Sequence, residues 1–275
     1  MRVIDAEKEI THIVSEIKQY FINNGNENTK AVIGISGGKD STVAAALLVR
    51  ALGPDRVVGV MMPNRTQDDI ADSIEVCEIL GISYYTFNIG YAYDAMINVF
   101  NYDVALPMNE QITTNTPARL RMTALYMVAA AVGGRVINTG NASERYVGYT
   151  TKYGDLAGDF AILRDYYVRD VYAIGDALPE LPRHLVHKVP SDGMSGKTDA
   201  DNMGFSYELL DAYLLDGATI TYDTMRKIEE RHKRNKHKEI INFPYIRAVT
   251  RHWDGNGEPP KDWGGMANYS GDYWF

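Results

Sequence analysis

Residues 31–41, AVIGISGGKDS, run from an apolar stretch directly into a turn rich in serine and glycine. The apolar stretch, 31–35, predicts a short buried strand, and residues 41–52, dense in Ala and Leu, predict the helix after it. Two glycines allow a tight turn and bring the backbone close to an anion. Because the start of a helix presents unpaired N–H groups with a partial positive charge, the stretch predicts a strand–loop–helix unit that holds a phosphate.

Alternating strands and helices continue along the chain. Apolar runs predict further strands at 57–62, 83–89 and 136–139, and helical spacing predicts helices at 10–21, 68–80 and 117–132. Thr116 is the expected cap of the last helix, with Pro117 at its first position. Since parallel neighbours need crossover connections, this order predicts an α/β fold, a doubly wound parallel sheet with helices on both faces. Ligands then bind at the carboxyl ends of the strands.

The rest of the chain predicts no second independent domain. Residues 140–195 are rich in Gly, Asp, Tyr and Pro and predict site-forming loops, and helices are expected at 169–178, 202–215 and 224–237. The sequence contains no evident internal repeat and no flexible linker. We therefore expect one domain over residues 1–275, with a sheet core at about 30–190, a helical part at about 200–250 and an aromatic, Gly- and Pro-rich tail at 254–275.

The composition excludes several classes of protein. With 45% hydrophobic and 23% charged residues, the 275-residue chain has a globular composition. Its 28 basic and 36 acidic residues give a net charge of −8, which disfavours a nucleic-acid partner. A single cysteine, Cys77, forms no intramolecular disulfide, so we expect a reducing, cytoplasmic location. No apolar run reaches the ~18 residues of a membrane span and no secretory signal is visible, so no membrane association is expected.

The loop at 36–41 carries polar side chains suited to a phosphate. Ser36 and Ser41 offer hydroxyl donors. Asp40 repels a bare phosphate, but its presence is explained if a magnesium ion stands between the carboxylate and phosphate oxygens. The string is not a Walker loop, because no Gly-x-x-x-x-Gly-Lys-Ser/Thr pattern occurs in the chain.

Ser36-Gly37-Gly38-x-Asp40-Ser41 resembles the pyrophosphate loop (PP-loop) of ATP pyrophosphatases, which attach AMP to a substrate oxygen and release pyrophosphate. Later motifs narrow the resemblance to the ammonia-dependent NAD synthetases. These motifs are TGNASE at 139–144, GYTTKYGD at 148–155 followed by Asp159, HKVPSDG at 187–193, GFSY at 204–207 and KHK at 236–238. The resemblance covers roughly residues 10–238.

The resemblance implies an adenine nucleotide alpha hydrolase-like fold and a ligase that forms a C–N bond. In that family the nicotinate carboxylate of deamido-NAD attacks the α-phosphorus of ATP and pyrophosphate leaves. Ammonia then displaces AMP from the NAD-adenylate and gives NAD. ATP is the implied co-substrate and Mg²⁺ the implied cofactor, and a homodimer is expected because family members are homodimers.

The resemblance also assigns site residues. Asp40, Ser36 and Lys152 are the expected catalytic residues, and Asp40 and Glu144 are the expected magnesium ligands. Substrate binding is assigned to Arg119 or Arg121, together with Lys152, Asp159, His237 and Lys238. The expected ATP-binding residues are Gly34, Ile35, Ser36, Gly37, Gly38, Lys39, Asp40, Ser41, Gln67, Thr139 and Ser191.

One position departs from the family pattern. Where many members carry an ATP-contacting lysine, this chain has Val168, and either Arg169 or Arg164 replaces the charge or the register is shifted. Arg65 lies close enough to the expected adenosine site to reach a phosphate. The charged run at 226–236 is interpreted mostly as a solvated helix, and only His237 and Lys238 at its end are expected to bind substrate.

The expected nitrogen donor is free ammonia. A glutaminase needs an activated cysteine with a base, whereas Cys77 occupies an apolar helical position expected in the core. A separate glutaminase chain is an alternative source of the ammonia. The alternative functions are another PP-loop adenylating enzyme, for tRNA thiolation or GMP synthesis, and a nucleotide sensor without turnover. Pyrophosphate release stimulated by deamido-NAD but not by XMP distinguishes these hypotheses.

Overall fold

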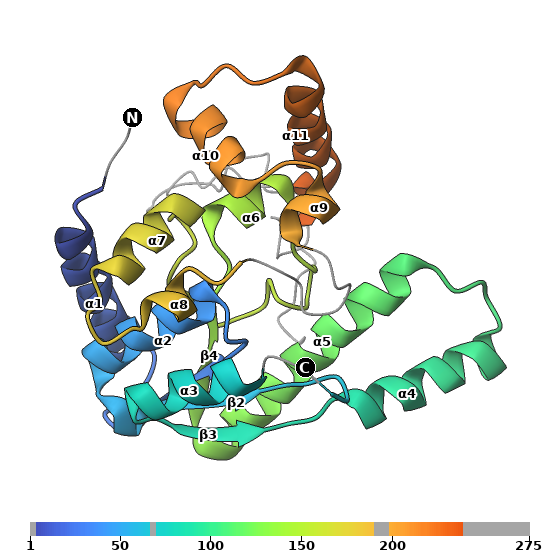
Figure 1. Ribbon diagram of the computed structural model, residues 1–275. Helices are drawn as coiled ribbons and strands as arrows, with labels where there is room; N and C mark the ends of the chain where they lie inside the picture. The colour runs from blue at the N-terminus through green and yellow to red at the C-terminus, as the bar shows by residue number, and fades with distance from the viewer. Residues whose placement is uncertain (1–3, 67–69, 190–197, 239–275) are drawn as a thin grey trace, which may run out of the picture. The chain divides into compact units, whose positions relative to one another are not determined.

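Five strands form one sheet in the order β3-β2-β1-β4-β5 (Figure 1). All neighbouring strands are parallel, and β1 lies in the middle of the sheet, paired with β2 on one side and β4 on the other. The predicted doubly wound parallel sheet is confirmed. The strands are β1 Lys30–Gly34, β2 Val57–Met61, β3 Ser83–Thr86, β4 Gly134–Asn138 and β5 Phe160–Ala161.

The computed structural model describes residues 4–66, 70–189 and 198–238. These residues belong to one compact unit, 1–239, and residues 240–275 make up a second unit. The expected tail at 254–275 lies outside the described residues. Of the helices that the structure describes, none combines the length and the apolar character that crossing a membrane requires.

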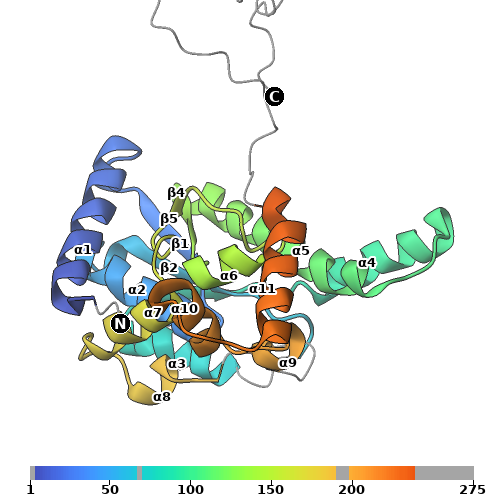
Figure 2. The ribbon, with the colours of Figure 1, turned by 90° about the horizontal axis from the view of Figure 1, so that it is seen from above.

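Helices cover both faces of the sheet, because successive strand residues point to opposite sides. Ala31 and Ile33 of β1 pack into the larger core, and Val32 packs into a smaller core against α5 (Glu110–Val132). Figure 2 shows α1, α2 and α7 lying side by side over the larger core. The helices of this core include α1 Ala6–Asn23, α2 Lys39–Leu52, α3 Ile70–Leu80 and α7 Val168–Asp176, and the short α8 (Arg183–Val186) also contributes Leu185 and Val186.

The first helix follows the spacing predicted from the sequence. Ile10, Ile13, Ile17 and Phe21 of α1 are buried, and they recur at intervals of three and four residues. The carboxylate of Asp5 accepts a hydrogen bond from the Lys8 N–H at 3.3 Å and so begins the helix. The amphipathic stripe therefore determines which face of α1 packs on the core.

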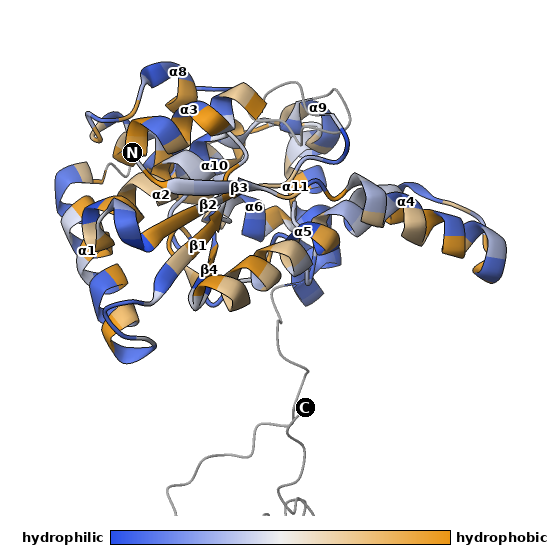
Figure 3. Cartoon of the chain, turned by 90° about the horizontal axis from the view of Figure 1, so that it is seen from below, coloured by the Kyte–Doolittle hydropathy of each residue, from blue (hydrophilic) through white to orange (hydrophobic). Residues whose placement is uncertain are grey.

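The segment between β3 and β4 differs most from the prediction. It contains α4 (Gly90–Val99) and the turn η2 (Phe100–Val104), which the sequence analysis missed. α5 begins at Glu110 because the Asn109 side chain caps it, accepting from the Ile112 N–H at 3.1 Å. Pro117 thus lies inside the helix, and its expected place at the first position is wrong. Residues 90–116, here called the arm, project from the sheet (Figures 1 and 3).

Short helices follow β4 where loops were expected. The single helix predicted at 202–215 is two helices, because Gly204, with φ +81°, ends the first and Ser206 caps the second. The remaining helices are η1 Pro54–Arg56, α6 Ala142–Val147, α8 Arg183–Val186, α9 Asp199–Met203, α10 Tyr207–Asp216, α11 Tyr222–Asn235 and η3 Lys236–Lys238.

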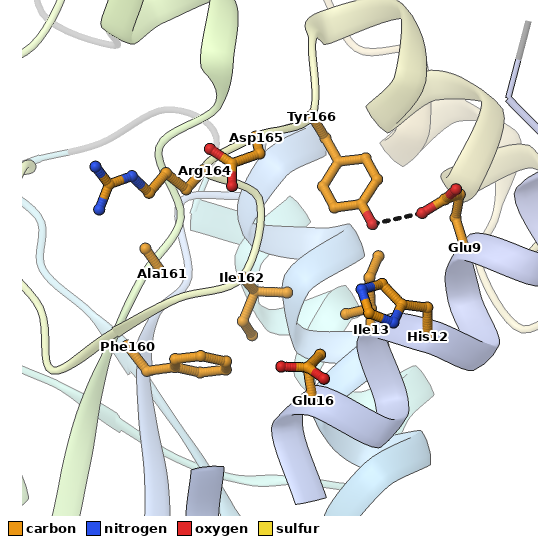
Figure 4. A pocket seen from close by; sticks show the side chains of 10 residues that line it. All are labelled: Glu9, His12, Ile13, Glu16, Phe160, Ala161, Ile162, Arg164, Asp165 and Tyr166. Carbon is orange, nitrogen blue, oxygen red and sulfur yellow. Dashed lines mark hydrogen bonds between the residues drawn. The ribbon is translucent and has the colours of Figure 1, made fainter. Parts of the chain in front are cut away.

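A hollow of about 370 Å³ lies between α1 and residues 160–166 (Figure 4). Its lining includes Glu9 and His12 from α1 and Arg164 and Asp165 from the opposite segment. The Tyr166 hydroxyl donates to the Glu9 carboxylate at 2.7 Å and closes one side. Acidic and basic groups both face this hollow, so its charge favours neither an anion nor a cation.

Candidate active site

The loop between β1 and α2 has the backbone that the Gly-Gly pair predicts. Gly37 adopts φ +72°, and a Cβ there would lie 2.8 Å from the Asp72 Cβ and 3.1 Å from the Ser73 nitrogen. Only glycine fits this position without displacing the start of α3. Gly38 begins α2, and no side chain caps the helix there. The first N–H groups of α2 are therefore available to an anion.

Two serines stabilise the turn of this loop. The Ser36 and Ser41 hydroxyl oxygens lie 3.1 Å apart, and Ser41 also donates to the Gly38 carbonyl at 3.0 Å. The Ser36 oxygen accepts from the Gly38 N–H at 3.3 Å. Ser36 itself is exposed, whereas Ser41 is buried. The predicted pair thus has two functions within the loop, since Ser41 organises the turn and Ser36 faces outward.

The ends of β1 and β4 meet where the strand order reverses. β1 pairs with β2 and β4, so the loops after β1 and β4 leave the sheet side by side. The Asn141 side chain, after β4, donates to Asp40 Oδ1 at 3.0 Å across 101 residues of sequence. This contact joins the two motifs that the sequence analysis singled out separately. Thr139, at the end of β4, is half-buried beside them.

Asn141 also holds Glu144, through a capping box at the start of α6. The Asn141 side chain accepts from the Glu144 N–H at 2.9 Å, and the Asn141 N–H donates to Glu144 Oε2 at 3.1 Å. Burial is the main cause that raises the pKa of Glu144 well above its usual range, and the charge of Asp40 adds to it. The two carboxylates therefore lie close enough to repel each other.

Lys39 lies under the loop with only 4% of its surface exposed. Its ammonium donates to Asp40 Oδ2 at 2.8 Å and lies 5.8 Å and 5.5 Å from the ring centroids of Tyr172 and Tyr207. Burial alone lowers the pKa of Lys39, but the charges of Asp40 and Glu144 outweigh it and the net shift is upward. The buried ammonium of Lys39 thus neutralises part of the negative charge of Asp40 and Glu144.

The carboxylates of Asp40 and Glu144 form a donor set that fits a divalent cation. Both supply hard oxygen atoms, and their mutual repulsion falls when a cation binds between them. Within the part of the chain that the structure describes, no three His, Cys, Asp or Glu side chains gather into a metal site. The remaining ligands of such a cation would be water molecules or phosphate oxygens of a bound nucleotide.

Several residues assigned to substrate binding lie together beside α11. The Lys152 ammonium donates to the His237 carbonyl at 3.2 Å, and Arg119 Nε donates to the Lys152 carbonyl at 3.3 Å. Lys238 donates to the carbonyls of Gly148 and Thr150 at 2.8 Å and 2.7 Å. These contacts bring together three assigned cations from separate segments: Arg119 of α5, Lys152 of the loop after α6 and Lys238 of η3.

Other assigned residues lie elsewhere. Arg121 Nε donates to the Met62 carbonyl after β2 at 3.0 Å. The Asp159 carboxylate accepts from the Val136 N–H at 2.7 Å and from the Tyr126 hydroxyl at 3.2 Å, so its contacts are with β4 and α5. Gln67 and Ser191 lie outside the described residues.

The two arginines named as substitutes for the missing lysine have contacts away from the loop. Val168 is buried, and its N–H donates to the Ser143 hydroxyl at 2.9 Å. Arg169 forms an ion pair with Asp216 at 2.6 Å, and Arg164 is exposed and lines the hollow beside α1 (Figure 4). Arg65, for which a phosphate contact was considered, forms an ion pair with Asp94.

Asn141 lies within the TGNASE motif at 139–144, but the sequence alone assigned no role to it. A signal was present, since Asn three residues before Glu is a capping-box pattern. What the pattern omits is the second contact of Asn141, to Asp40. Asp211, which follows the GFSY motif of the family resemblance, was likewise given no role. Its buried carboxylate accepts from the Ser143 hydroxyl at 2.6 Å and from the Arg169 N–H at 3.0 Å, so it connects α6 to α7.

A loop of free amides and a carboxylate pair at the switch point of a parallel sheet define a nucleotide-binding α/β protein of the pyrophosphate-loop class. Comparison with known families narrows this class. The chain belongs to the NAD synthase family, whose model matches residues 9–242.

Individual relatives agree with this assignment. The chain is 40% identical over 215 residues to the NH3-dependent NAD(+) synthetase of Pyrococcus furiosus. The aligned residues cover 78% of this chain and 79% of that protein. The structure of NMN synthetase from Francisella tularensis matches with a TM-score of 0.79 and 32% identity over 90% of this chain and 100% of that one. For the NH3-dependent NAD synthetase from Campylobacter jejuni the TM-score is 0.70 and the identity 27%, over 89% and 99% of the chains. The predicted resemblance and adenine nucleotide alpha hydrolase-like fold are confirmed.

Proposed function

We propose that this protein is a ligase that converts deamido-NAD to NAD with ATP and ammonia and releases AMP and pyrophosphate. One observation carries the proposal for this chain: the Asn141–Asp40 contact of 3.0 Å, which joins the loop after β1 to the motif after β4 at the switch point. A nucleotide bound to the free amides of α2 then has its phosphates next to the carboxylate pair. Family membership supports the same reaction.

The loop contributes positioning and charge stabilisation. A carboxylate is a poor electrophile, so it is first joined to AMP as the NAD-adenylate, and ammonia then displaces AMP. The N–H groups at the start of α2 hold the leaving pyrophosphate, and the exposed hydroxyl of Ser36 donates to the same oxygens. Lys152, on the segment next to α11, orients the substrate by its charge. This reaction requires no nucleophilic side chain.

Asp40 and Glu144 are the residues that would hold magnesium. The ion supplies positive charge where negative charge develops on the departing pyrophosphate. Asn141 fixes both carboxylates at once, since it donates to each of them. Lys39 reduces their repulsion before the ion binds, because its ammonium pairs with Asp40.

The remaining assignments extend the site along the same edge of the sheet. Ile35, whose N–H is bonded to the Val60 carbonyl at 3.0 Å, leads into the loop, and Thr139 flanks it. Arg119 is favoured over Arg121 as a substrate residue, because its side chain contacts Lys152. The proposed ATP contacts of Gln67 and Ser191 rest on the family resemblance alone. The proposed substrate contact of Asp159 rests on the same resemblance.

Free ammonia is the proposed nitrogen donor. The single cysteine of the chain, Cys77, is buried, and burial raises the pKa of its thiol to about 11. A thiol with so high a pKa is protonated at neutral pH and is a weak nucleophile, which argues against glutaminase chemistry at this residue. Ammonium chloride should therefore support NAD formation, and glutamine alone should not.

We further propose a cytoplasmic homodimer, in which the arm contacts a second copy of the chain. The arm exposes large apolar side chains, including Tyr91 and Tyr102 at 87% and 83% of their surface and also Leu106. Such a patch on one projecting element is typical of a protein interface. Tyr102→Glu should convert dimer to monomer in sedimentation, whereas Tyr222→Glu, at an exposed site on α11, should not.

A second candidate substrate is the mononucleotide, nicotinate mononucleotide, with NMN as the product. It is favoured by the match to NMN synthetase, whose TM-score of 0.79 exceeds the 0.70 of the NAD synthetase from Campylobacter jejuni. Both substrates carry the same nicotinate carboxylate, so the reaction is identical. Comparison of kcat/KM for the two nucleotides, with ammonium chloride in excess, decides between them.

The test of the proposed function measures AMP, pyrophosphate and NAD together. The purified protein with ATP, Mg²⁺, ammonium chloride and deamido-NAD should form all three in equal amounts. Release of ADP in place of AMP would contradict adenylation. Pyrophosphate release with XMP would indicate a GMP-forming relative, and ATP binding without any release would indicate a nucleotide sensor.

A further inference from the structure

The helix α11 has two faces that differ in how their charges are balanced. On the outer face, Lys227 pairs with Asp223 at 2.7 Å and Arg226 pairs with Asp223 and Glu230 at 3.5 Å and 3.4 Å. All four side chains are exposed, as expected for a solvated helix surface. This face agrees with the interpretation from the sequence.

The inner face of α11 packs against the segment that follows α6. His232 Nδ1–H donates to the Tyr146 carbonyl at 2.7 Å, and the two rings stack with centroids 4.1 Å apart. The Asn235 amide donates to the Val147 carbonyl at 3.0 Å. A Cβ on Gly148 would lie 2.1 Å from the Asn235 Cβ, so the helix approaches this glycine closely. These contacts fix α11 to the element that carries Glu144.

Arg231 lies on the inner side and has no acidic partner within the described part of the chain. Its guanidinium is half-buried, with Cζ 5.9 Å from the centroid of the Tyr149 ring. Its Nε is fully buried and has no hydrogen-bond acceptor, and no carboxylate among the described residues forms an ion pair with it. A buried donor without an acceptor costs free energy that a bound ligand could recover.

The surroundings of Arg231 are rich in positive charge. Burial lowers the pKa of Arg231, and the charge of Arg234 lowers it further. Burial likewise lowers the pKa of Lys238; the charge of Asp155 opposes this shift, and repulsion by Arg231 and Arg234 adds to it. The hydroxyl of Thr150, whose carbonyl accepts from Lys238, is buried without a partner as well. Among the described residues, a guanidinium with an unused buried donor, beside an unused hydroxyl and further positive charge, favours an anion.

This position is connected to the loop through Tyr207. The Tyr207 ring lies 5.5 Å from the Lys39 ammonium under the loop, and the same tyrosine is close enough to Arg231 to be among the groups that act on the pKa of Arg231. The Arg231 guanidinium forms a cation–π contact with the Tyr149 ring. The Tyr149 hydroxyl accepts a hydrogen bond from the Asn202 side chain at 3.1 Å. Arg231 is therefore held on the side of α11 that faces the candidate active site.

We infer that Arg231 is an anion-binding residue, whose guanidinium receives a phosphate of a nucleotide substrate. The inference rests on the proposed function for the identity of the substrate. The phosphate belongs either to ATP or to the pyrophosphate of deamido-NAD, which present the same chemistry.

The experiment compares Arg231→Gln with Arg226→Gln in the full chain. The control removes the same charge from the ion-paired outer face of the same helix. We expect Arg231→Gln to raise the KM for one of the two nucleotides by about ten- to a hundredfold with kcat little changed, as loss of a charge-assisted hydrogen bond predicts. Arg226→Gln should leave both KM values unchanged.

The nucleotide whose KM rises identifies the source of the phosphate. Unchanged KM values for both nucleotides in a folded Arg231→Gln protein overturn the inference, and so does a loss of kcat alone. If Arg231→Gln fails to fold, Arg231→Lys decides by the same measurement, because lysine keeps the charge but loses the planar fork, so a smaller rise in KM is expected.

A binding measurement keeps this test separate from the proposed function. Inorganic pyrophosphate should raise the melting temperature of the wild-type protein more than that of Arg231→Gln, whether or not the enzyme forms NAD. Equal stabilisation of the two proteins would overturn the inference. A wild-type protein that forms no NAD, yet shows the difference in melting temperature, would overturn only the proposed function.

Discussion

The loop after β1 and the inner face of α11 both carry buried cations, but they balance them differently. At the loop, Lys39 pairs with Asp40, and Asn141 holds the carboxylates of Asp40 and Glu144 in place. On α11, Arg231 faces an aromatic ring and has no acidic partner among the described residues. In the first region Lys39 neutralises part of the negative charge of the carboxylate pair. The charge that remains favours a divalent cation bound together with the phosphates of a nucleotide. The second has a surplus of positive charge that an anion would neutralise.

The largest expected effect tests the loop. Asp40→Asn removes a charge from the carboxylate pair and should lower the rate of NAD formation roughly a thousandfold, because the charge on the leaving pyrophosphate loses its stabilisation. Production of AMP and pyrophosphate measures it. Asp55→Asn, at an exposed turn before β2, is the matched control and should have wild-type activity. A fully active Asp40→Asn protein would remove the loop from the mechanism.

Lys39→Met tests whether the loop is internally compensated. The substitution leaves Asp40 and Glu144 without their cation and should lower the free energy of unfolding by about 3 kcal/mol, as for other broken buried pairs. Excess Mg²⁺ should restore part of that loss, because the ion replaces the missing charge. Urea unfolding with and without Mg²⁺ measures both effects. A variant as stable as wild type in the absence of Mg²⁺ would show that Lys39 does not offset the charge of Asp40 and Glu144.

Asn141→Ala removes both the cap of α6 and the contact with Asp40, and comparison with the loss of another cap separates the two effects. Loss of the cap should lower the free energy of unfolding by about 1 kcal/mol. The rate should also fall about tenfold or more, because Asp40 loses the side-chain amide that holds it, while the Asn141 N–H to Glu144 remains. Asp5→Ala, which removes the cap of α1, should show a comparable loss of stability and no loss of rate. Matching rates for the two variants would reduce Asn141 to a structural cap.

The smallest effect concerns Lys238 at the end of α11. Its two hydrogen bonds to main-chain carbonyls indicate a structural role, while the family resemblance assigns it to substrate. Lys238→Met should lower the free energy of unfolding by about 1 kcal/mol and raise the KM for deamido-NAD. Lys236→Met, at an exposed neighbour, should change neither quantity. A change in stability without a change in KM would favour the structural role alone.

The loop could be predicted because its information is local. A strand, two glycines, an acid and a helix follow one another within residues 31–52, and each element determines the next through short-range geometry. The start of α5 was misplaced for the opposite reason. Pro117 is a strong local signal, but the helix was already begun by the Asn109 cap.

The inner face of α11 could not be recognised from its composition. Within 222–235 a single residue, Ile228, is buried, so the charged run reads as a solvated helix. Counting by helical intervals from Ile228 gives Arg231, Asn235 and Lys238, which is the stripe that packs inward. That signal was available, but polar residues on such a stripe do not reveal what they contact.

By itself, the sequence determined the parallel sheet, the loop at 36–41 and membership of the NAD synthase family, because these depend on periodicity and on motifs of consecutive residues. Only the tertiary structure decided that Asn141 bonds Asp40, that Lys39 lies beneath the loop and that Arg231 has no carboxylate partner in the described residues. The physical reason is that charge balance depends on distance in space, and residues 101 positions apart become neighbours only when β1 and β4 pair.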